Sequence, residues 1–216
     1  MRTIAIIGLS SFGHYLCRYL SDAGTQVLAV DIDERQIDEI KPFVSKAVVA
    51  DARDKETLQA LGLEDVDVVV VSVGEPIDTS ILITLYLKEL GVKEIIAKAS
   101  SVDHGKILDK IGASEIVFPE RDMAKRIAYT LRRSTLFDYI ALAEGYSIVE
   151  MAPAQAWIGK SLNQLDFRKK HKAQIILIKD VIGGGALIPT GEYTVKDSDL
   201  LVIMGRDNEM EELSKI

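Results

Sequence analysis

Cysteine is almost absent from this sequence, and so is any long run of apolar residues. Cys17 is the one cysteine among 216 residues, so no disulfide can form within the chain. No apolar stretch approaches the roughly 18 residues that a membrane-spanning helix needs. The chain runs from Met1 directly into a strand-like segment, so we expect no signal peptide. These absences favour a cytoplasmic protein.

A surplus of basic residues is also missing. Lysine and arginine number 26 against 33 aspartates and glutamates, which gives a net charge of -7. Nucleic-acid-binding proteins normally carry a basic surplus on one face, so we expect no nucleic-acid partner. The same balance gives no reason to expect direct docking on anionic lipid headgroups.

Recognisable catalytic and metal-binding motifs are missing as well. The three histidines, His14, His104 and His171, accompany no catalytic constellation. The sequence contains no GxxxxGK[ST] phosphate loop, no GxSxG nucleophile turn and no Cys/His metal spacing. A hydride-transfer enzyme would need an acid or base beside the nicotinamide. The pattern favours a sensor, with a small NAD(H)-dependent oxidoreductase as the alternative.

What is present, from Thr3 to about Phe118, is a regular alternation of β-branched runs and amphipathic segments. The runs Ile4–Ile7 and Val68–Val71 are apolar without alternation, which is typical of strands covered on both faces. This βαβα order predicts an α/β fold with a Rossmann-like, doubly wound parallel sheet. We expect strands at 3–8, 26–31, 46–50, 67–72, 94–98 and 115–118, and helices near 11–23, 34–41, 54–61, 77–90 and 103–111.

The pattern changes after a further helix, expected over about 119–133. Pro119 suits the first position of that helix, because its missing N–H would have no partner there. Beyond it, glycine-rich turns separate short strand-like segments, which predicts a small α+β domain. We therefore expect a nucleotide-binding domain over 1–134 and a second domain over 135–216. The expected strands of the second domain are 146–151, 173–179, 186–188 and 200–204.

The first expected strand ends in a glycine-spaced motif, Gly8-Leu9-Ser10-Ser11-Phe12-Gly13. This is the dinucleotide-binding fingerprint with its middle glycine replaced by Ser10. The first glycine makes the tight turn, and the last one lets the helix pack closely on the strand. The helix that starts here would aim unpaired N–H groups at a phosphate. We expect Ser10 to crowd the approach of a pyrophosphate.

Carboxylates stand at the end of the second expected strand and directly after the third. Asp31 stands about 20 residues after the motif, where a carboxylate accepts hydrogen bonds from ribose hydroxyls and disfavours a 2′-phosphate. Asp51 is placed to edge the adenine ring and to accept from its exocyclic amine. A Rossmann fold without a ligand is the structural alternative. The other residues expected at the site are Ile32, Asp33, Ala52, Val73 and Gly74.

These segments resemble the regulators of K⁺ conductance (RCK) of Ktr/Trk-type potassium uptake systems, in their single-repeat form. The resemblance covers nearly the whole chain. Ordinary dehydrogenases do not combine a helix that starts as at Pro119–Ala124 with a C-terminal segment of this kind. The segments that carry it are Ile6–Gly13, Val27–Asp33, Ile111–Ala113, Pro119–Ala124, Ile158–Leu162 and Asp199–Gly205.

The resemblance implies a cytoplasmic regulatory subunit without catalysis. Similar proteins bind ATP, ADP, or sometimes NAD or NADH in the Rossmann half. They form homodimers that assemble into a ring, a tetramer or an octamer, on the inner face of the membrane under a separate potassium channel or transporter. A gating subunit of another cation channel, or of a cation/proton antiporter, stays open as an alternative.

Matching positions imply roles for single residues. Glu120 matches a carboxylate that helps to hold a divalent or monovalent cation between paired subunits; the alternative is an acid that complements the helix dipole. Lys98 ends the fifth strand, where it would neutralise phosphate or simply be solvated. The positions that match the family's nucleotide site are Gly8, Ser11, Gly13, Asp31, Asp33 and Asp51.

The chain departs from the family at two places. Ser10 replaces a usual glycine, and Ser11 stands where some relatives have an arginine that reaches the terminal phosphate of a neighbouring subunit's ATP. Losing that guanidinium removes a bidentate phosphate contact, which leaves ADP, AMP and NAD open as ligands.

Two features of the tail and its preceding helix also have implied roles. Some relatives bind cyclic di-AMP between two C-terminal domains, and Arg168 would meet its phosphate; a solvated basic face is the alternative. Ile127 and Leu131 lie on a helix that resembles the family's dimerising crossover. An apolar stripe of this kind can equally pack within its own domain.

Overall fold

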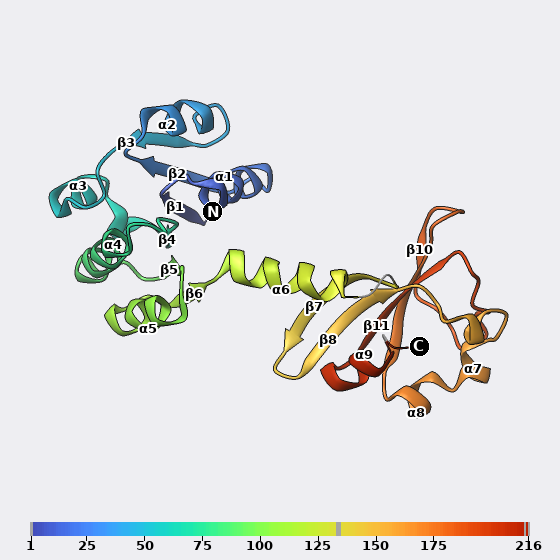
Figure 1. Ribbon diagram of the computed structural model, residues 1–216. Helices are drawn as coiled ribbons and strands as arrows, with labels where there is room; N and C mark the ends of the chain where they lie inside the picture. Colours follow the sequence, from blue (N-terminus) through green and yellow to red (C-terminus); the bar gives the residue numbers. More distant parts are fainter. Residues whose placement is uncertain (1, 133–134, 214, 216) are drawn as a thin grey trace. The chain divides into compact units, whose positions relative to one another are not determined.

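The computed structural model describes residues 2–132, 135–213 and 215. Contacts divide the chain into two compact units, Met1–Glu120 and Arg121–Ile216 (Figure 1). The predicted domain boundary lies at 134, and residues 133–134 are outside the described ranges. The contacts group the helix after Glu120 with the second unit, so the assignment of that helix to the first domain stays a prediction.

The first unit contains a six-stranded sheet in which every pair of neighbours is parallel. The strand order is β3-β2-β1-β4-β5-β6, so successive strands are added first on one side of β1 and then on the other. The predicted doubly wound parallel sheet is confirmed. Its strands are β1 (Thr3–Ile7), β2 (Gln26–Asp31), β3 (Lys46–Val49), β4 (Val68–Val71), β5 (Ile95–Lys98) and β6 (Glu115–Val117).

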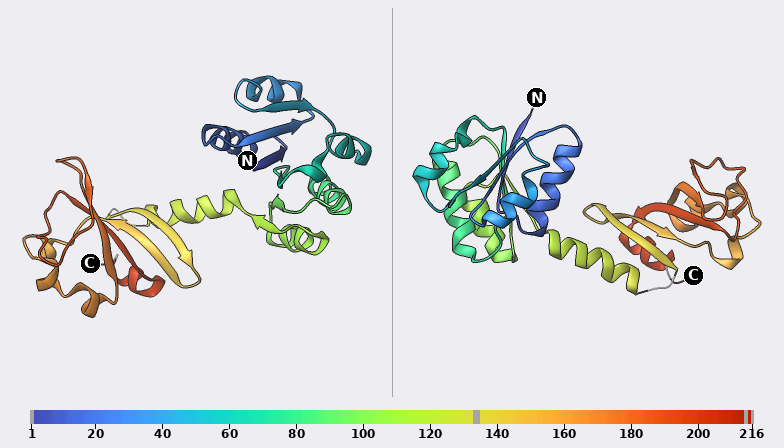
Figure 2. Two further views of the ribbon diagram at one scale, coloured as in Figure 1. Left: turned by 180° about the vertical axis from the view of Figure 1, so that it is seen from behind. Right: turned by 90° about the horizontal axis from the view of Figure 1, so that it is seen from above.

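Helices cover both faces of this sheet (Figure 2). One face packs on Cys17 of α1 and Ile37 of α2. The other packs on Leu58, Leu87 and Leu108, which belong to α3, α4 and α5. Buried side chains therefore line both sides of each central strand, which is why these strands read as unbroken apolar runs. The helices are α1 (Ser11–Asp22), α2 (Glu34–Ile40), α3 (Lys55–Ala60), α4 (Ile77–Glu89) and α5 (Val102–Ile111), with a 3₁₀ turn, η1 (Leu63–Asp65).

The second unit is built on a five-stranded antiparallel sheet, in the order β10-β9-β11-β8-β7. Its core includes Met151, Trp157, Ile178 and Leu201. The predicted small α+β domain is confirmed, and the strand β7 adds to it. The elements are α6 (Pro119–Leu131), β7 (Leu136–Ala143), β8 (Tyr146–Met151), η2 (Gln155–Trp157), α7 (Leu162–Leu165), α8 (Phe167–His171), β9 (Gln174–Asp180), β10 (Ala186–Leu187), β11 (Asp199–Arg206) and α9 (Asp207–Leu213).

The helices of the described ranges are too short or too polar to span a bilayer. The longest, α4 and α6, have 13 residues each.

Candidate functional site

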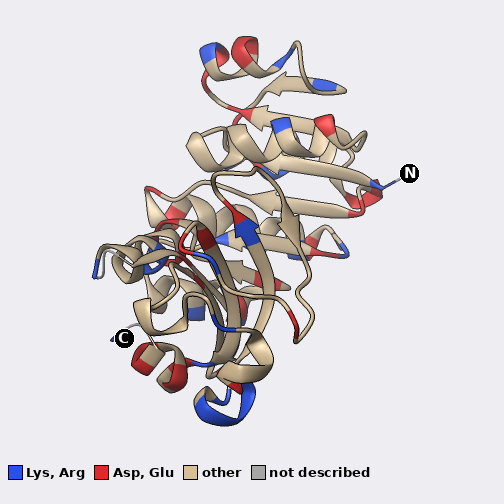
Figure 3. Cartoon of the chain, turned by 90° about the vertical axis from the view of Figure 1, so that its right-hand side faces the viewer, with Lys and Arg blue, Asp and Glu red and all other residues tan. Residues whose placement is uncertain are grey.

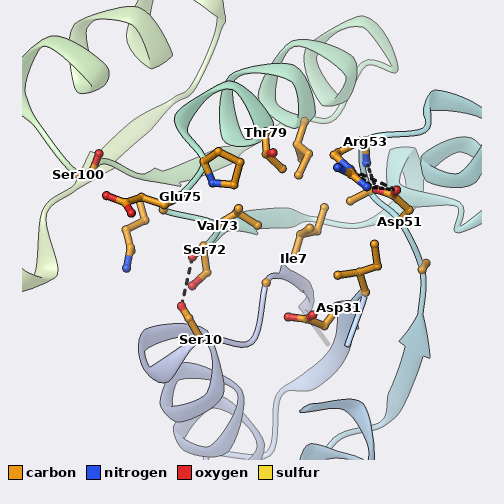
Figure 4. Close-up of a pocket in the computed structure, with 18 of the residues that line it drawn as sticks. Ile7, Ser10, Asp31, Asp51, Arg53, Ser72, Val73, Glu75, Thr79 and Ser100 are labelled. Atoms are coloured by element: carbon orange, nitrogen blue, oxygen red, sulfur yellow. Dashed lines mark hydrogen bonds and ion pairs between the residues drawn. The ribbon is translucent and has the colours of Figure 1, made fainter. Parts of the chain in front are cut away.

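A cavity of about 690 Å³ lies at the carboxyl ends of the parallel strands of the first unit (Figure 4). The order of β2, β1 and β4 places it at the point where strand addition changes direction, the usual ligand crevice of such sheets. Its volume is within the range of small-molecule sites. It brings together these predicted residues: Gly8, Ser10, Asp31, Ile32, Asp51, Ala52, Val73, Gly74, Lys98 and Glu120.

The turn between β1 and α1 requires glycine at two positions. Gly8 has φ +92°, and a Cβ there would lie 2.8 Å from Val73 Cγ2. A Cβ on Gly13 would lie 2.0 Å from the carbonyl oxygen of Gly8. Gly13 therefore supports the turn from the helix side and does not itself line the cavity, and Phe12 packs into the core beside it.

The N-terminus of α1 begins at the cavity and has no side-chain cap among the described residues. Ser10 is the N-cap, but its side chain caps no backbone N–H, and no acidic residue stands in the first turn. By contrast, Asp33, Asp54 and Ser101 cap α2, α3 and α5 with their own side chains. A helix end left in this state attracts an anion. Ser11 is exposed in this first turn and does not line the cavity.

The Asp31 carboxylate connects β2 to the glycine turn. One oxygen accepts a hydrogen bond from the N–H of Leu9 at 2.6 Å, and the other accepts from the N–H of Asp33 at 2.8 Å. A carboxylate offers about four lone-pair sites, so acceptor capacity remains for ribose hydroxyls. Asp33 does not line the cavity; it caps α2 and pairs with Arg35, which holds the pKa of Asp33 below its usual range.

Asp51 has a close partner that the sequence analysis did not anticipate. Its carboxylate forms a bidentate ion pair with Arg53, with Asp51 Oδ2 2.7 Å from Arg53 Nη2. The hydrogen bonds from Arg53 lower the pKa of Asp51 to about 2. Arg53 also lines the cavity, so this pair supplies a planar cation to the site.

Lys98 and Glu120 form the second ion pair of the cavity. Lys98 Nζ lies 2.6 Å from Glu120 Oε1, and the lysine side chain is only 11% exposed, against 66% for the glutamate. The hydrogen bond from Lys98 lowers the pKa of Glu120. In the described part of the chain, no group of three or more His, Cys, Asp or Glu residues is arranged to hold a metal ion. The cation predicted at Glu120 stays a prediction for paired subunits.

His104 supports the cavity wall from behind. It is buried, and its Nδ1 accepts a hydrogen bond from the N–H of Ser100 at 3.2 Å. The ring must therefore carry its proton on Nε2, which lies 2.9 Å from Ser80 Oγ. Burial lowers the pKa of His104, in agreement with this neutral form.

Comparisons with known proteins agree with this geometry. Residues 4–119 match the TrkA-N domain, and residues 146–216 match the TrkA-C domain. The chain is 40% identical over 215 residues to the Ktr system potassium uptake protein C of Bacillus subtilis, covering 99% of this chain and 96% of that protein. This chain belongs to the Ktr/Trk potassium uptake family.

A second relative supports this assignment, and a solved structure is similar in fold. The family member is 38% identical over 209 residues to the Ktr system potassium uptake protein A of Bacillus subtilis, covering 97% of this chain and 94% of that protein. Its fold is similar to that of the GsuK channel bound to NAD, with a TM-score of 0.66 and 21% identity, over 96% of this chain and 38% of that one. The predicted RCK-type family is confirmed.

In this Ktr/Trk family member, Arg168 lies in the second unit, away from the residues of the nucleotide motif in sequence. It is exposed on α8 and borders a smaller cavity of about 210 Å³, together with Asn163, Gln174 and Pro189. Three of the five residues of α8 are lysines or arginines, Arg168, Lys169 and Lys170, and this helix is drawn mostly in blue (Figure 3). Cyclic di-AMP binding at Arg168 stays a prediction.

Several lining residues were not predicted from the sequence. Apart from Ile7 at the end of β1, they come from the loops that follow β3, β4 and β5 and from the first turns of α4, where no motif marks them. Ser72 is notable because its buried hydroxyl has no hydrogen-bond partner within the part of the chain that the structure describes. A polar atom of this kind at the site edge has capacity for a bound group. The unpredicted lining residues are Ile7, Ala50, Arg53, Ser72, Glu75, Pro76, Thr79, Ile83 and Ser100.

Proposed function

We propose that this chain is the nucleotide-binding regulatory subunit of a Ktr-type potassium uptake system. It acts without catalysis on a separate potassium channel or transporter in the membrane. The observation that supports this most directly is the cavity bordered by Gly8, Asp31 and Lys98, in a chain 40% identical over nearly its full length to a Ktr system potassium uptake protein.

An adenine nucleotide is the ligand that this cavity fits. Its ribose hydroxyls would donate to Asp31, and its phosphates would lie at the N-terminus of α1, within reach of Lys98. The base would then extend toward the loop after β3. The similar GsuK structure carries NAD, which agrees with a site for the adenosine diphosphate moiety. ADP, ATP, AMP, NAD and NADH are all candidates.

Regulation requires only that nucleotides bind two shapes of the assembly with different free energy. Two copies of this chain would pair and build a ring, a tetramer or an octamer, on the cytoplasmic side of the membrane partner. Glu120 would contribute a carboxylate to a cation between paired subunits. A nucleotide-dependent change of the ring would then alter the pore.

A sensor accounts for the site better than an oxidoreductase does. Both ring nitrogens of His104 are engaged, by Ser100 on one side and Ser80 on the other. That imidazole is therefore committed to joining α4 and α5 and is not free for acid or base catalysis.

A thermal-shift panel of the purified full chain tests the proposal. The panel contains ATP, ADP, AMP, NAD, NADH and cyclic di-AMP. A ligand that binds only the folded state raises the melting temperature by mass action. We expect stabilisation by at least one adenine nucleotide and a smaller shift in Asp31→Ala at the same nucleotide concentration. Absence of any shift, or steady NADH turnover with a small carbonyl substrate, would count against a nucleotide sensor.

A further inference from the structure

In the loop after β3, Asp51 and Arg53 form hydrogen bonds with each other. Asp51 Oδ1 accepts from the backbone N–H of Arg53 at 3.0 Å and from Nε at 2.9 Å. Asp51 Oδ2 accepts from Nε at 3.2 Å and from Nη2 at 2.7 Å. These four contacts use the lone-pair sites that a carboxylate offers, and they fix the guanidinium in a fork.

This pair lies at one end of the cavity. Figure 4 shows Asp51 and Arg53 on the side away from Ser10, with Asp31 between them. Since Ser10 marks the helix end that suits phosphate and Asp31 marks the ribose, the base belongs at the end where Arg53 lies. The other lining residues from this region include Ile32 and Ala52, which are apolar.

We infer that Arg53, held in place by Asp51, stacks its guanidinium plane on the nucleotide base. Asp51 is then a positioning residue for Arg53. It does not accept from the exocyclic amine of adenine, which is the role that the sequence analysis predicted for it. This inference rests on the proposed nucleotide-binding function. A planar, weakly hydrated guanidinium stacks well on aromatic rings, and lysine does not replace it in that geometry.

The chain contains a matched pair outside the cavity. Asp33 and Arg35 have the same spacing, and Asp33 likewise accepts from the backbone N–H and the guanidinium of Arg35. Neither residue lines the cavity. Arg35→Met therefore breaks an equivalent local ion pair without touching the proposed base site.

The experiment is calorimetric titration of the full chain with AMP, ADP and inosine diphosphate. The variants are Arg53→Met, Arg53→Lys, Asp51→Asn and the double variant Asp51→Asn/Arg53→Met, with Arg35→Met as the control. We expect Arg53→Met to weaken AMP and ADP by the same factor, about five- to thirtyfold. Arg53→Lys keeps the charge but not the plane, so its affinity should also fall. Arg35→Met should bind like the unmodified protein.

The role of Asp51 is tested by the same titrations. We expect Asp51→Asn to weaken ADP and inosine diphosphate equally, and the double variant to lose no more than Arg53→Met, since both changes remove one interaction. A loss in Arg53→Met confined to ADP would mean a phosphate contact and overturn the inference. The inference would also be overturned if Asp51→Asn weakened ADP but not inosine diphosphate, or if Arg53→Met bound the nucleotides with unchanged affinity. If the unmodified chain bound none of these three nucleotides and none of ATP, NAD and NADH in the same titrations, the proposed function itself would fail.

Discussion

The Asp31 carboxylate accepts hydrogen bonds within the fold and, in the proposed function, also from the ligand. It accepts from the N–H groups of Leu9 and Asp33, and we assign its remaining lone pairs to ribose. Asp31→Ala should weaken ADP binding by about 1–3 kcal/mol, the usual effect of losing a charged acceptor. Calorimetric titration checks this value.

A control for Asp31 is available in the same unit. Asp67 accepts from the N–H of Thr3 at 2.8 Å and does not line the cavity. Asp67→Ala should lower the free energy of unfolding but leave ADP affinity unchanged. Equal affinity losses in both variants would mean that Asp31 acts through the fold alone.

Lys98 has two competing partners, Glu120 and the expected phosphate. Breaking the 2.6 Å pair from the glutamate side leaves the buried ammonium free for the ligand. With divalent cations chelated, Glu120→Gln should therefore bind ADP more tightly, and Lys98→Met should weaken ADP by roughly 1–3 kcal/mol. Fluorescence or calorimetric titration measures both. Weaker binding in Glu120→Gln would contradict this competition.

The sequence predicted the part of the site that follows a spacing rule. Gly8 and Asp31 were found because the turn and the ribose need those residue types at a fixed separation. Arg53, Thr79 and Ser100 were missed because their place in the wall depends on how three loops pack against one another. Arg53 had one local signal, its position two residues after Asp51 in the loop beyond β3.

Helices α4 and α5 are joined by the buried His104. Its neutral ring accepts from Ser100 and faces Ser80, so His104→Gln should lower the free energy of unfolding by about 1–3 kcal/mol at neutral pH. Burial lowers the pKa of His104 in the folded state. As pH falls below the ordinary histidine value, about 6.5, the unfolded chain therefore binds a proton that the folded chain resists.

The difference in the free energy of unfolding between the unmodified protein and His104→Gln should consequently shrink as the pH falls from 7.5 through the lowered pKa of His104. Chemical denaturation at several pH values measures it. His171, whose pKa is also lowered by burial, is common to both proteins and cancels in the difference. An advantage that stays constant down to pH 5 would mean that His104 titrates equally in both states.

The ends of the parallel strands were predicted to within one or two residues, because these strands are buried on both faces and read as apolar runs. Strand β7 was missed, because the sequence analysis placed no strand between residues 134 and 146. Phe137, Ile140 and Leu142 lie on β7 and are exposed, so the polar alternation that marks a half-buried strand is lacking. The short helix α9 was also missed, since its seven residues give little periodic signal.

We expect two copies of this chain to pair through α6. Met123, Ile127 and Leu131 recur every fourth residue and are exposed within this chain. An exposed apolar stripe of this kind marks an interaction surface. Ile127→Glu should shift the protein from dimer to monomer in sedimentation velocity experiments.

Val49→Glu is a matched control, because Val49 and Ile127 are both 48% exposed. It should leave the dimer unchanged, since Val49 lies on β3 and not on α6. An unmodified protein that is monomeric, or an Ile127→Glu variant that stays dimeric, would contradict a dimer formed through α6.

Potassium flux tests the central claim most directly. Vesicles would contain a Ktr-type membrane subunit, with this chain added alone or with ATP, ADP or NAD. We predict that the unmodified chain makes the flux depend on which nucleotide is present. We also predict that Asp31→Ala moves this dependence to about 5- to 150-fold higher nucleotide concentration, without preventing association with the vesicles. A flux that is the same with and without nucleotide, for a chain that associates with the membrane subunit, would contradict the account.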